Sequence, residues 1–192
     1  GYNGAGGEIG HITVNHDEIE PCNCGQYGCL EQYTSATGIV RMAKRKLAKT
    51  QDATKLRDYK DITAKDIFDV AKEGDEVALG LVDEVGEILG STLSNIACVT
   101  NPEVIVIGGG VSKAGQILID TIQKHFASMH VVIPALNWHS LAMMPEYTGQ
   151  CNSLSDKFKK QNHMHSKHFR VGRKCLLCFF VLFYHYPVEK IS

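Results

Sequence analysis

The sequence predicts an α/β fold, on the strength of two observations. Apolar residues recur at helical spacing in three separate segments between residues 35 and 99. A short apolar run, "VIVI", follows them, ends in three glycines and leads into a further amphipathic segment. Helix, buried strand, glycine turn and helix in succession are typical of α/β proteins, because a strand buried on both faces needs helices to cover it.

The first predicted elements are a short β-rich run, "HITV", at residues 11–14 and a helix over residues 35–49. The basic run Lys44–Lys46 falls mostly on the polar side of that helix, and we interpret it as a solvated face. A second helix is expected to begin after Thr63, which is followed three residues later by Asp66, and to end at Gly74.

A longer helix is predicted over residues 75–99. The residues expected on its buried face are Val77, Leu81, Val85, Ile88, Leu89, Leu93, Ile96 and Ala97. The run "PEVIVIGGGVSKAG" then predicts a buried strand, a glycine turn and a last helix that continues to about Phe126.

Composition restricts the possible functions. With 44% hydrophobic residues, 21% charged residues and a net charge of −1, the chain resembles a soluble globular protein and has no charge excess for nucleic acid or an anionic membrane. It shows no secretory signal, so we expect a cytoplasmic protein. It begins with Gly1 in a glycine-rich run, and we expect it to be a piece of a longer protein.

The charge balance changes along the chain. Residues 1–128 carry 12 Lys/Arg and 18 Asp/Glu, whereas residues 129–192 carry 8 and 3, with six of the nine histidines. We therefore predict a domain at 1–128 and an irregular tail at 129–192 that is not part of it. A frameshift or gene-model error is the favoured origin of the tail.

Two patterns in the tail could be interpreted as functional sites. One is a set of possible metal ligands: His163, His165, His168, Cys175 and Cys178. These histidines lack a defined loop spacing, so a second metal site is not favoured. The other, "LLCFFVLF", is far shorter than the roughly 20 residues that span a membrane.

The segment "HITVNHDEIEPCNCGQYGCLE" places three cysteines within eight residues, after a histidine. A disulfide framework is disfavoured in a reducing compartment, and simple packing suits a lone cysteine such as Cys98 better than a polar, glycine-rich turn. Three thiolates and one imidazole make a tetrahedral zinc set. Zinc is the favoured interpretation, although the spacing is not that of common zinc fingers. The candidate ligands are His11, Cys22, Cys24 and Cys29.

Glu8 and Glu31 flank this cluster. A metal-bound His11 keeps one ring N–H as an oriented donor, and two carboxylates beside it accept hydrogen bonds. Such a set suits the hydroxyls of a polyol or sugar. The alternative is that both glutamates are ordinary exposed acids at helix ends.

The motifs "AGGEIGHITV", "CNCGQYGCLE" and "NPEVIVIGGGVSKAG" resemble the ROK family of repressors and sugar kinases, and within it the glucokinases of Gram-positive bacteria. The resemblance runs from residue 1 to about Phe126. It implies the C-terminal lobe of a two-lobed, actin-like or ribonuclease-H-like α/β fold with a structural zinc loop. It also matches the cysteines and His11 to the family's zinc ligands.

The resemblance further implies roles in substrate binding. Glu8, His11 and Glu31 match sugar-hydroxyl contacts, and the turn of Gly108, Gly109 and Gly110 matches the one that approaches the adenosine of ATP. The implied activity is ATP-dependent phosphorylation of glucose at its 6-hydroxyl, with Mg²⁺ on the phosphates and a homodimer as the assembly. A kinase for N-acetylmannosamine, fructose or N-acetylglucosamine, and a sugar-sensing repressor that binds DNA, are alternatives. A third is a zinc-binding interaction module without a ligand.

Three family features do not occur in this sequence. Family kinases carry a D-x-G-G-T phosphate loop and a catalytic aspartate before the matching segment, and an L-G-N-D-A-G type helix near their end. We therefore expect the chain alone to be inactive as a kinase.

Overall fold

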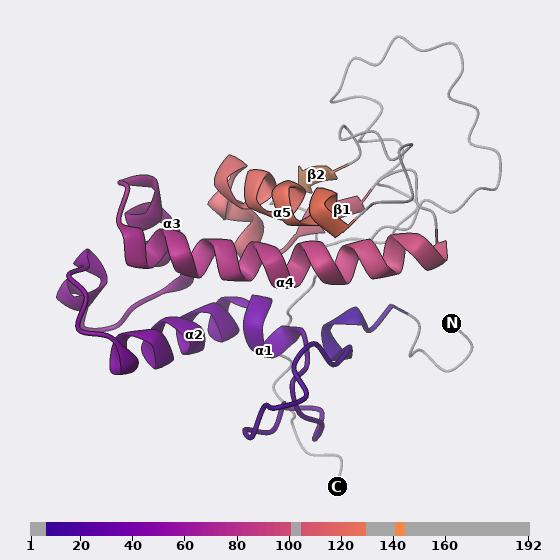
Figure 1. Ribbon diagram of the computed structural model, residues 1–192, viewed down its shortest axis with the longest axis horizontal. Helices are drawn as coiled ribbons and strands as arrows, with labels where there is room; N and C mark the ends of the chain where they lie inside the picture. Colours follow the sequence, from indigo (N-terminus) through magenta and orange to yellow (C-terminus); the bar gives the residue numbers. More distant parts are fainter. Residues whose placement is uncertain (1–6, 101–104, 130–140, 145–192) are drawn as a thin grey trace, which may run out of the picture.

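The computed structural model describes residues 7–100, 105–129 and 141–144. A long central helix, α4, has α1, α2 and an irregular N-terminal loop on one side, and α5 with two short strands on the other (Figure 1). The elements in chain order are η1 (Ile9–His11), α1 (Glu31–Thr34), α2 (Ala36–Lys49), η2 (Lys55–Asp58), α3 (Ala64–Lys72), α4 (Glu76–Thr100), β1 (Ile105–Gly108), η3 (Gly110–Ala114), α5 (Gln116–Met129) and β2 (Leu141–Met144).

The predicted helices α2 and α3 are confirmed, together with their start signals. The hydroxyl of Ser35 accepts a hydrogen bond from the backbone N–H of Gly38 at 2.9 Å and so caps α2. Thr63 and Asp66 form a reciprocal capping box at the start of α3. The chain leaves α3 through Gly74, whose φ of 87° is a left-handed conformation that glycine adopts without strain.

Helix α4 is also confirmed, but it is buried over a wider arc than the sequence predicts. Ile88 and Ile96 are only half-buried, while Ala78, Val82 and Thr92 lie in the core. The reason is that α1 and α2 pack on α4 from one side, α5 packs on it from the other, and α3 contacts it as well. A helix between two layers hides more than one stripe of its surface.

Two glycines of α4 allow α5 to approach closely. A Cβ atom at Gly90 would lie 2.8 Å from the carbonyl oxygen of Ile122, and one at Gly86 would collide with the side chain of Thr121. Because real Cβ atoms do not come so near, a side chain at either position would push the two helices apart. The α4–α5 contact therefore depends on small residues as well as on buried apolar ones.

Strand β1 is confirmed as a buried strand, and it pairs in parallel with β2, with Ile105 opposite Leu141. The glycine turn follows β1, but the next helix does not begin at once. A 3₁₀ turn, η3, comes first, the chain turns at Gly115 with φ 79°, and α5 then runs to Met129 rather than to about Phe126. The domain boundary expected near Ser128 stays a prediction.

The expectation of a strand at "HITV" is wrong. His11 ends the 3₁₀ turn η1, and Thr13 makes only an isolated antiparallel bridge with Cys29. The β-rich residues of this run had favoured a strand, but the segment instead folds against the cysteine turn.

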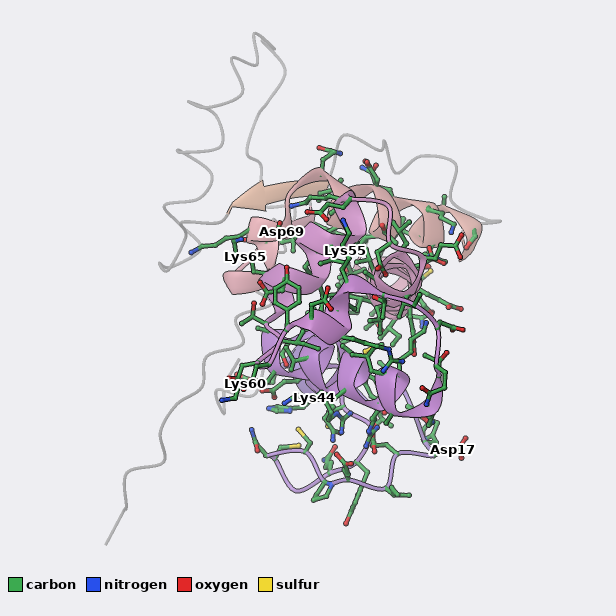
Figure 2. The ribbon with its side chains drawn as sticks, turned by 90° about the vertical axis from the view of Figure 1, so that its left-hand side faces the viewer. Asp17, Lys44, Lys55, Lys60, Lys65 and Asp69 are labelled. Carbon is green, nitrogen blue, oxygen red and sulfur yellow. The ribbon has the colours of Figure 1, made fainter. Side chains whose placement is uncertain are left out.

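Charged side chains cover the outer surface, among them Lys55, Lys60 and Lys65 at the end that faces the viewer in Figure 2. In the part of the chain that the structure describes, none of the helices combines the length and the apolar character needed to cross a bilayer. The possible second metal site and the "LLCFFVLF" run lie outside the described residues.

Candidate functional site

The cysteine loop, residues 11–30, is folded back on itself by a few backbone hydrogen bonds. Bridges join Thr13 to Cys29 and Pro21 to Tyr27. Gly28 sits where the two arms meet, with φ 69°, and a Cβ atom there would collide with the backbone carbonyl of Asn15. Only glycine combines that backbone angle with so close an approach. The loop is thus a compact hairpin-like turn without extended strands.

The loop brings together all four candidate metal ligands. One ligand atom from each of His11, Cys22, Cys24 and Cys29 lies within 4.8 Å of all the others. Cys24 Sγ is 3.6 Å from Cys29 Sγ, and Cys22 Sγ is 3.8 Å from His11 Nδ1. Tetrahedral zinc with sulfur at about 2.3 Å and nitrogen at about 2.0 Å separates neighbouring ligand atoms by about 3.5–3.8 Å. The residues therefore fit a zinc ion in number, type and spacing.

Two of the three thiols lie in an environment that disfavours their ionised form. The pKa of Cys29 is raised to about 12, mainly by burial and in addition by the neighbouring thiols of Cys24 and Cys22. Burial also raises the pKa of Cys22. Without a cation these buried groups are neutral thiols, whereas a metal ion compensates the charge of the thiolates.

His11 and Glu31 lie side by side at the edge of the cluster. Glu31 Oε2 is 3.8 Å from His11 Nδ1 and 4.0 Å from Cys22 Sγ. Since Nδ1 faces the thiols, Nε2 is the ring atom left for another partner, and the His11 side chain is 36% exposed. The arrangement offers a fixed N–H donor beside a carboxylate acceptor.

Glu8 lies at the start of η1, three residues before His11. Residues three apart in a 3₁₀ turn lie on the same side of it, which places Glu8 one turn from His11. Glu8 is exposed, and its carboxylate makes no hydrogen bond or ion pair within the described residues. It is available to an external hydroxyl.

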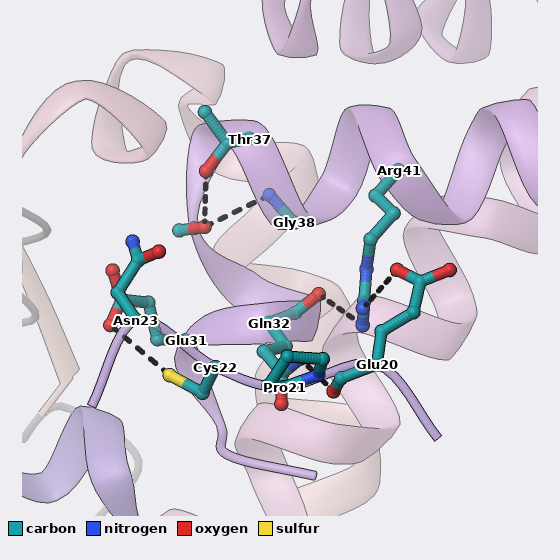
Figure 3. A pocket seen from close by; sticks show the side chains of 10 residues that line it. Glu20, Pro21, Cys22, Asn23, Glu31, Gln32, Thr37, Gly38 and Arg41 are labelled. Atoms are coloured by element: carbon teal, nitrogen blue, oxygen red, sulfur yellow. Dashed lines mark hydrogen bonds and ion pairs between the residues drawn. The ribbon is translucent and has the colours of Figure 1, made fainter. Parts of the chain in front are cut away.

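An open pocket adjoins Glu31 on the side of α2 (Figure 3). Its wall carries carboxylates, amides, hydroxyls and a guanidinium, so it can exchange hydrogen bonds with a polar ligand. The lining residues are Glu20, Pro21, Cys22, Asn23, Glu31, Gln32, Ser35, Thr37, Gly38 and Arg41.

A buried ion-pair cluster supports the loop, and sequence reasoning missed it. Glu18, whose side chain is 1% exposed, accepts hydrogen bonds from Arg41 at 2.8 Å, from Arg45 at 2.9 Å and from the Tyr33 hydroxyl at 2.6 Å. The Arg45 hydrogen bond is the main reason why the pKa of Glu18 lies far below its usual range. Glu20 completes the cluster, with Arg45 at 2.7 Å.

The interpretation of Lys44–Lys46 as a solvated face is therefore wrong for one of its members. Lys44 is exposed (Figure 2), but Arg45 reaches across to the buried carboxylate of Glu18. Arg41 and Arg45 are four residues apart on one face of α2, opposite an acidic pair two residues apart in the loop. The spacing of these charges was the one signal in the sequence that could have indicated the cluster. Local sequence does not say, however, which charges pair across 23 to 27 residues.

The glycine turn lies elsewhere. Gly108 ends β1, and Gly109, with φ 79°, is the N-cap residue of η3. A Cβ atom at Gly110 would meet no atom within 4 Å. The turn is closed by the Ser112 hydroxyl, which donates to the Gly109 carbonyl at 2.6 Å. Its open side would let a ligand approach the backbone.

The predicted site residues thus form two groups. His11, Glu31 and the cysteines come together, whereas the glycine turn belongs to the layer on the other side of α4 (Figure 1). Contact of the turn with a nucleotide stays a prediction.

Comparison with known proteins assigns the chain to a family. The profile of the ROK family matches residues 1–146. The chain belongs to the ROK family. A glucokinase of Halalkalibacterium halodurans is 48% identical over 129 residues, which are 66% of this chain and 39% of that protein. A xylose repressor of Caldicellulosiruptor bescii is 29% identical over 126 residues, 65% of this chain and 31% of that protein.

The solved structures give the fold of this ROK chain. A ROK family glucokinase from Streptomyces griseus, crystallised with glucose and AMPPNP, superimposes with a TM-score of 0.61 and 33% identity over 70% of this chain and 45% of that one. The chain thus shares the α/β architecture of ROK sugar kinases, the actin-like ATPase fold. It spans about two fifths of the length of the curated glucokinases that it matches.

Proposed function

We propose that the protein acts in ATP-dependent phosphorylation of glucose at its 6-hydroxyl and that this chain supplies its sugar-orienting residues. The observation that carries the proposal is the position of the Glu31 carboxylate, 3.8 Å from a histidine that lies within a Cys₃His cluster. The glucokinase relatives, including the one crystallised with glucose and AMPPNP, support this assignment.

The cluster's role is structural in this proposal. Zinc held by His11, Cys22, Cys24 and Cys29 has four protein ligands and no open position for chemistry, so it fixes the loop and the orientation of the imidazole. Glu8 and Glu31 accept hydrogen bonds from sugar hydroxyls, and His11 donates one through Nε2. These groups hold the reacting hydroxyl in place.

The glycine turn Gly108–Gly110 is proposed to accept the adenosine part of ATP, with Mg²⁺ on the phosphates. Phosphoryl transfer depends mainly on positioning and on stabilisation of charge.

The test measures glucose-dependent ATP consumption in a coupled assay by the full product of the gene, with N-acetylmannosamine, fructose and N-acetylglucosamine as competing substrates. Glu31→Gln removes a charge-assisted hydrogen bond worth about 1.5–3 kcal/mol, so we expect the glucose KM to rise roughly tenfold to a hundredfold while the ATP KM stays unchanged. Glu84→Gln, the same exchange at an exposed position of α4, is the control. Equal glucose KM values for both variants would remove Glu31 from the site.

A sugar-sensing repressor is the second candidate, because the xylose repressor matches nearly the same share of this chain as the glucokinase does. A repressor would bind the sugar without consuming ATP and would retard DNA from its own promoter region in a gel. The coupled assay and the DNA assay give opposite outcomes for the two candidates.

A further inference from the structure

Glu18 is the one charged residue that is buried within the described part of the chain. One of its carboxylate oxygens, Oε1, also accepts hydrogen bonds from the backbone N–H groups of Ile19 and Glu20, both at 3.0 Å. Together with the bonds from Arg41, Arg45 and the tyrosine hydroxyl, these fill its acceptor positions. The carboxylate joins three elements: the cysteine loop, α1 and α2.

The same elements carry the proposed zinc and sugar groups. Tyr33, which donates to Glu18, lies in α1 two residues after Glu31, and its hydroxyl also accepts from the Asn15 side chain at 2.9 Å. Arg41 lies 5.3 Å above the Tyr33 ring, measured to its centre. Movement of the Glu18 carboxylate would therefore displace α1, the helical turn that contains Glu31.

A second set of contacts passes from this cluster to a metal ligand. Arg41 donates to the backbone carbonyl of Gln32 at 3.0 Å. The Gln32 side chain donates to the carbonyl of Glu20 at 2.9 Å and accepts from the backbone N–H of Cys29 at 3.0 Å (Figure 3 shows the first two). The ion-pair cluster and Cys29 are thus separated by one buried glutamine.

A purely stabilising role explains this arrangement poorly. Replacing a buried ion pair by apolar residues of similar volume is often neutral for stability, because desolvation offsets the attraction of the charges. The charged groups instead provide hydrogen bonds of defined geometry, each of which holds one carboxylate oxygen of Glu18 next to one donor. That property matters where the distances between several groups must be set, as in a metal and sugar site.

We propose that Glu18 is a positioning residue: through Arg41, Arg45 and Tyr33 it sets the cysteine loop against α1, so that the zinc ligands and Glu31 keep their mutual geometry. The inference rests on the proposed function, since it takes the Cys₃His cluster to hold zinc.

The test measures the rate at which zinc passes from the chain to an excess of a coloured chelator, well below the unfolding temperature. Glu18→Gln keeps the shape of the side chain and removes its charge. Tyr33→Phe is milder, because it removes one donor and keeps the ring under Arg41. We expect about tenfold faster release for Glu18→Gln, the size typical of lost support around a metal site, and a smaller acceleration for Tyr33→Phe.

Ile122→Ala is the matched control, because it destabilises α5 on the far side of α4 without touching the loop. It should lower the unfolding temperature and leave zinc release unchanged. The cobalt-substituted chain gives a second readout, since a distorted tetrahedral site changes its visible absorption bands in Glu18→Gln and not in Ile122→Ala.

Release at the parent rate from Glu18→Gln, or equal acceleration by Ile122→Ala, would overturn the inference. If Glu18→Gln does not fold, Tyr33→Phe decides by the same criterion. A parent chain that binds no zinc would instead contradict the metal site in the proposed function, and the measurement of zinc in the parent separates the two failures.

Discussion

The cysteine loop and the helices α3, α4 and α5 are held together by different forces. The helices bury Ile67, Leu81, Leu93, Leu118 and Ile122 almost completely. The loop buries little apolar surface: Ile12, Ile19 and Tyr27 are 40%, 85% and 51% exposed. Polar bonds, an ion-pair cluster and four candidate metal ligands take the place of a core there. The helices should therefore respond to lost volume, and the loop to lost charge or lost metal.

The largest difference between the cysteine loop and the helices is expected in the variant Cys24→Ser. Because structural zinc binding and local folding are one equilibrium, this variant should lose zinc, and residues 11–30 should exchange amide hydrogens rapidly while α3 to α5 stay protected. Elemental analysis and hydrogen exchange measure the two effects.

Cys98→Ser is the control for that variant, since Cys98 is an exposed cysteine of α4 outside the cluster. It should keep one zinc per chain. Zinc retained in Cys24→Ser, or a parent with almost none, would show that the cluster is not a zinc site.

The reverse experiment is Ile122→Ala, which opens a cavity between α5 and α4. Its side chain is 0% exposed, so the free energy of unfolding should fall by about 2–5 kcal/mol in urea titrations. Ile122→Val should cost about 0.5–1.5 kcal/mol. Zinc content should match the parent's in both variants, and loss of zinc in step with stability would mean that loop and helices form one cooperative unit.

The same contrast explains what the sequence could and could not predict. Helical periodicity located α2, α3, α4 and α5, because each buries an apolar face and periodicity records such faces. It did not foresee the wide burial of α4, since one helix's pattern does not say how many neighbours cover it. The β-rich residues of "HITV" suggested a strand, but the backbone partners there come from the cysteine turn.

The candidate site divides in the same way. Close spacing in the chain identified Cys22, Cys24 and Cys29, since short loops bring near neighbours together whatever the fold. The ion pair of Glu18 with Arg45 was not predicted, because it joins residues 27 apart in the sequence and forms only when α2 packs against the loop. Supporting groups of this kind depend on tertiary structure and leave no local pattern.

A moderate effect on the helices is expected from Asp75, which caps α4. Its carboxylate accepts from the backbone N–H groups of Ala78 at 3.0 Å and Lys55 at 2.9 Å and from the Thr54 hydroxyl at 2.9 Å. Burial alone would raise the pKa of Asp75, but these hydrogen bonds outweigh it and the pKa is lowered. Asp75→Ala should cost about 0.5–2 kcal/mol at neutral pH.

The sign of the pH dependence follows from the lowered pKa. A carboxylate with a folded-state pKa below its unfolded value of 3.8 stabilises the fold above that pH and loses this contribution as the pH falls through the folded value. The difference in unfolding free energy between the parent and Asp75→Ala should therefore shrink in acid. A difference that stays constant from neutral pH down to about pH 3 would mean that the charge of Asp75 contributes nothing.

The smallest effect on stability is expected from breaking an ion pair that is exposed to solvent. Lys55 and Glu73 form an ion pair at 2.6 Å, as short as the bond between Tyr33 and Glu18, yet their side chains are 61% and 56% exposed. Water and salt screen such a pair, and ordering two long side chains offsets most of the attraction. Glu73→Gln should therefore give the parent's unfolding midpoint at low and high salt, and the parent's zinc release. Glu18→Gln, the same exchange of carboxylate for amide, should change both. If the exposed pair proved as costly to break as the buried one, burial would not be what distinguishes them, and the special role given to Glu18 would lose its physical basis.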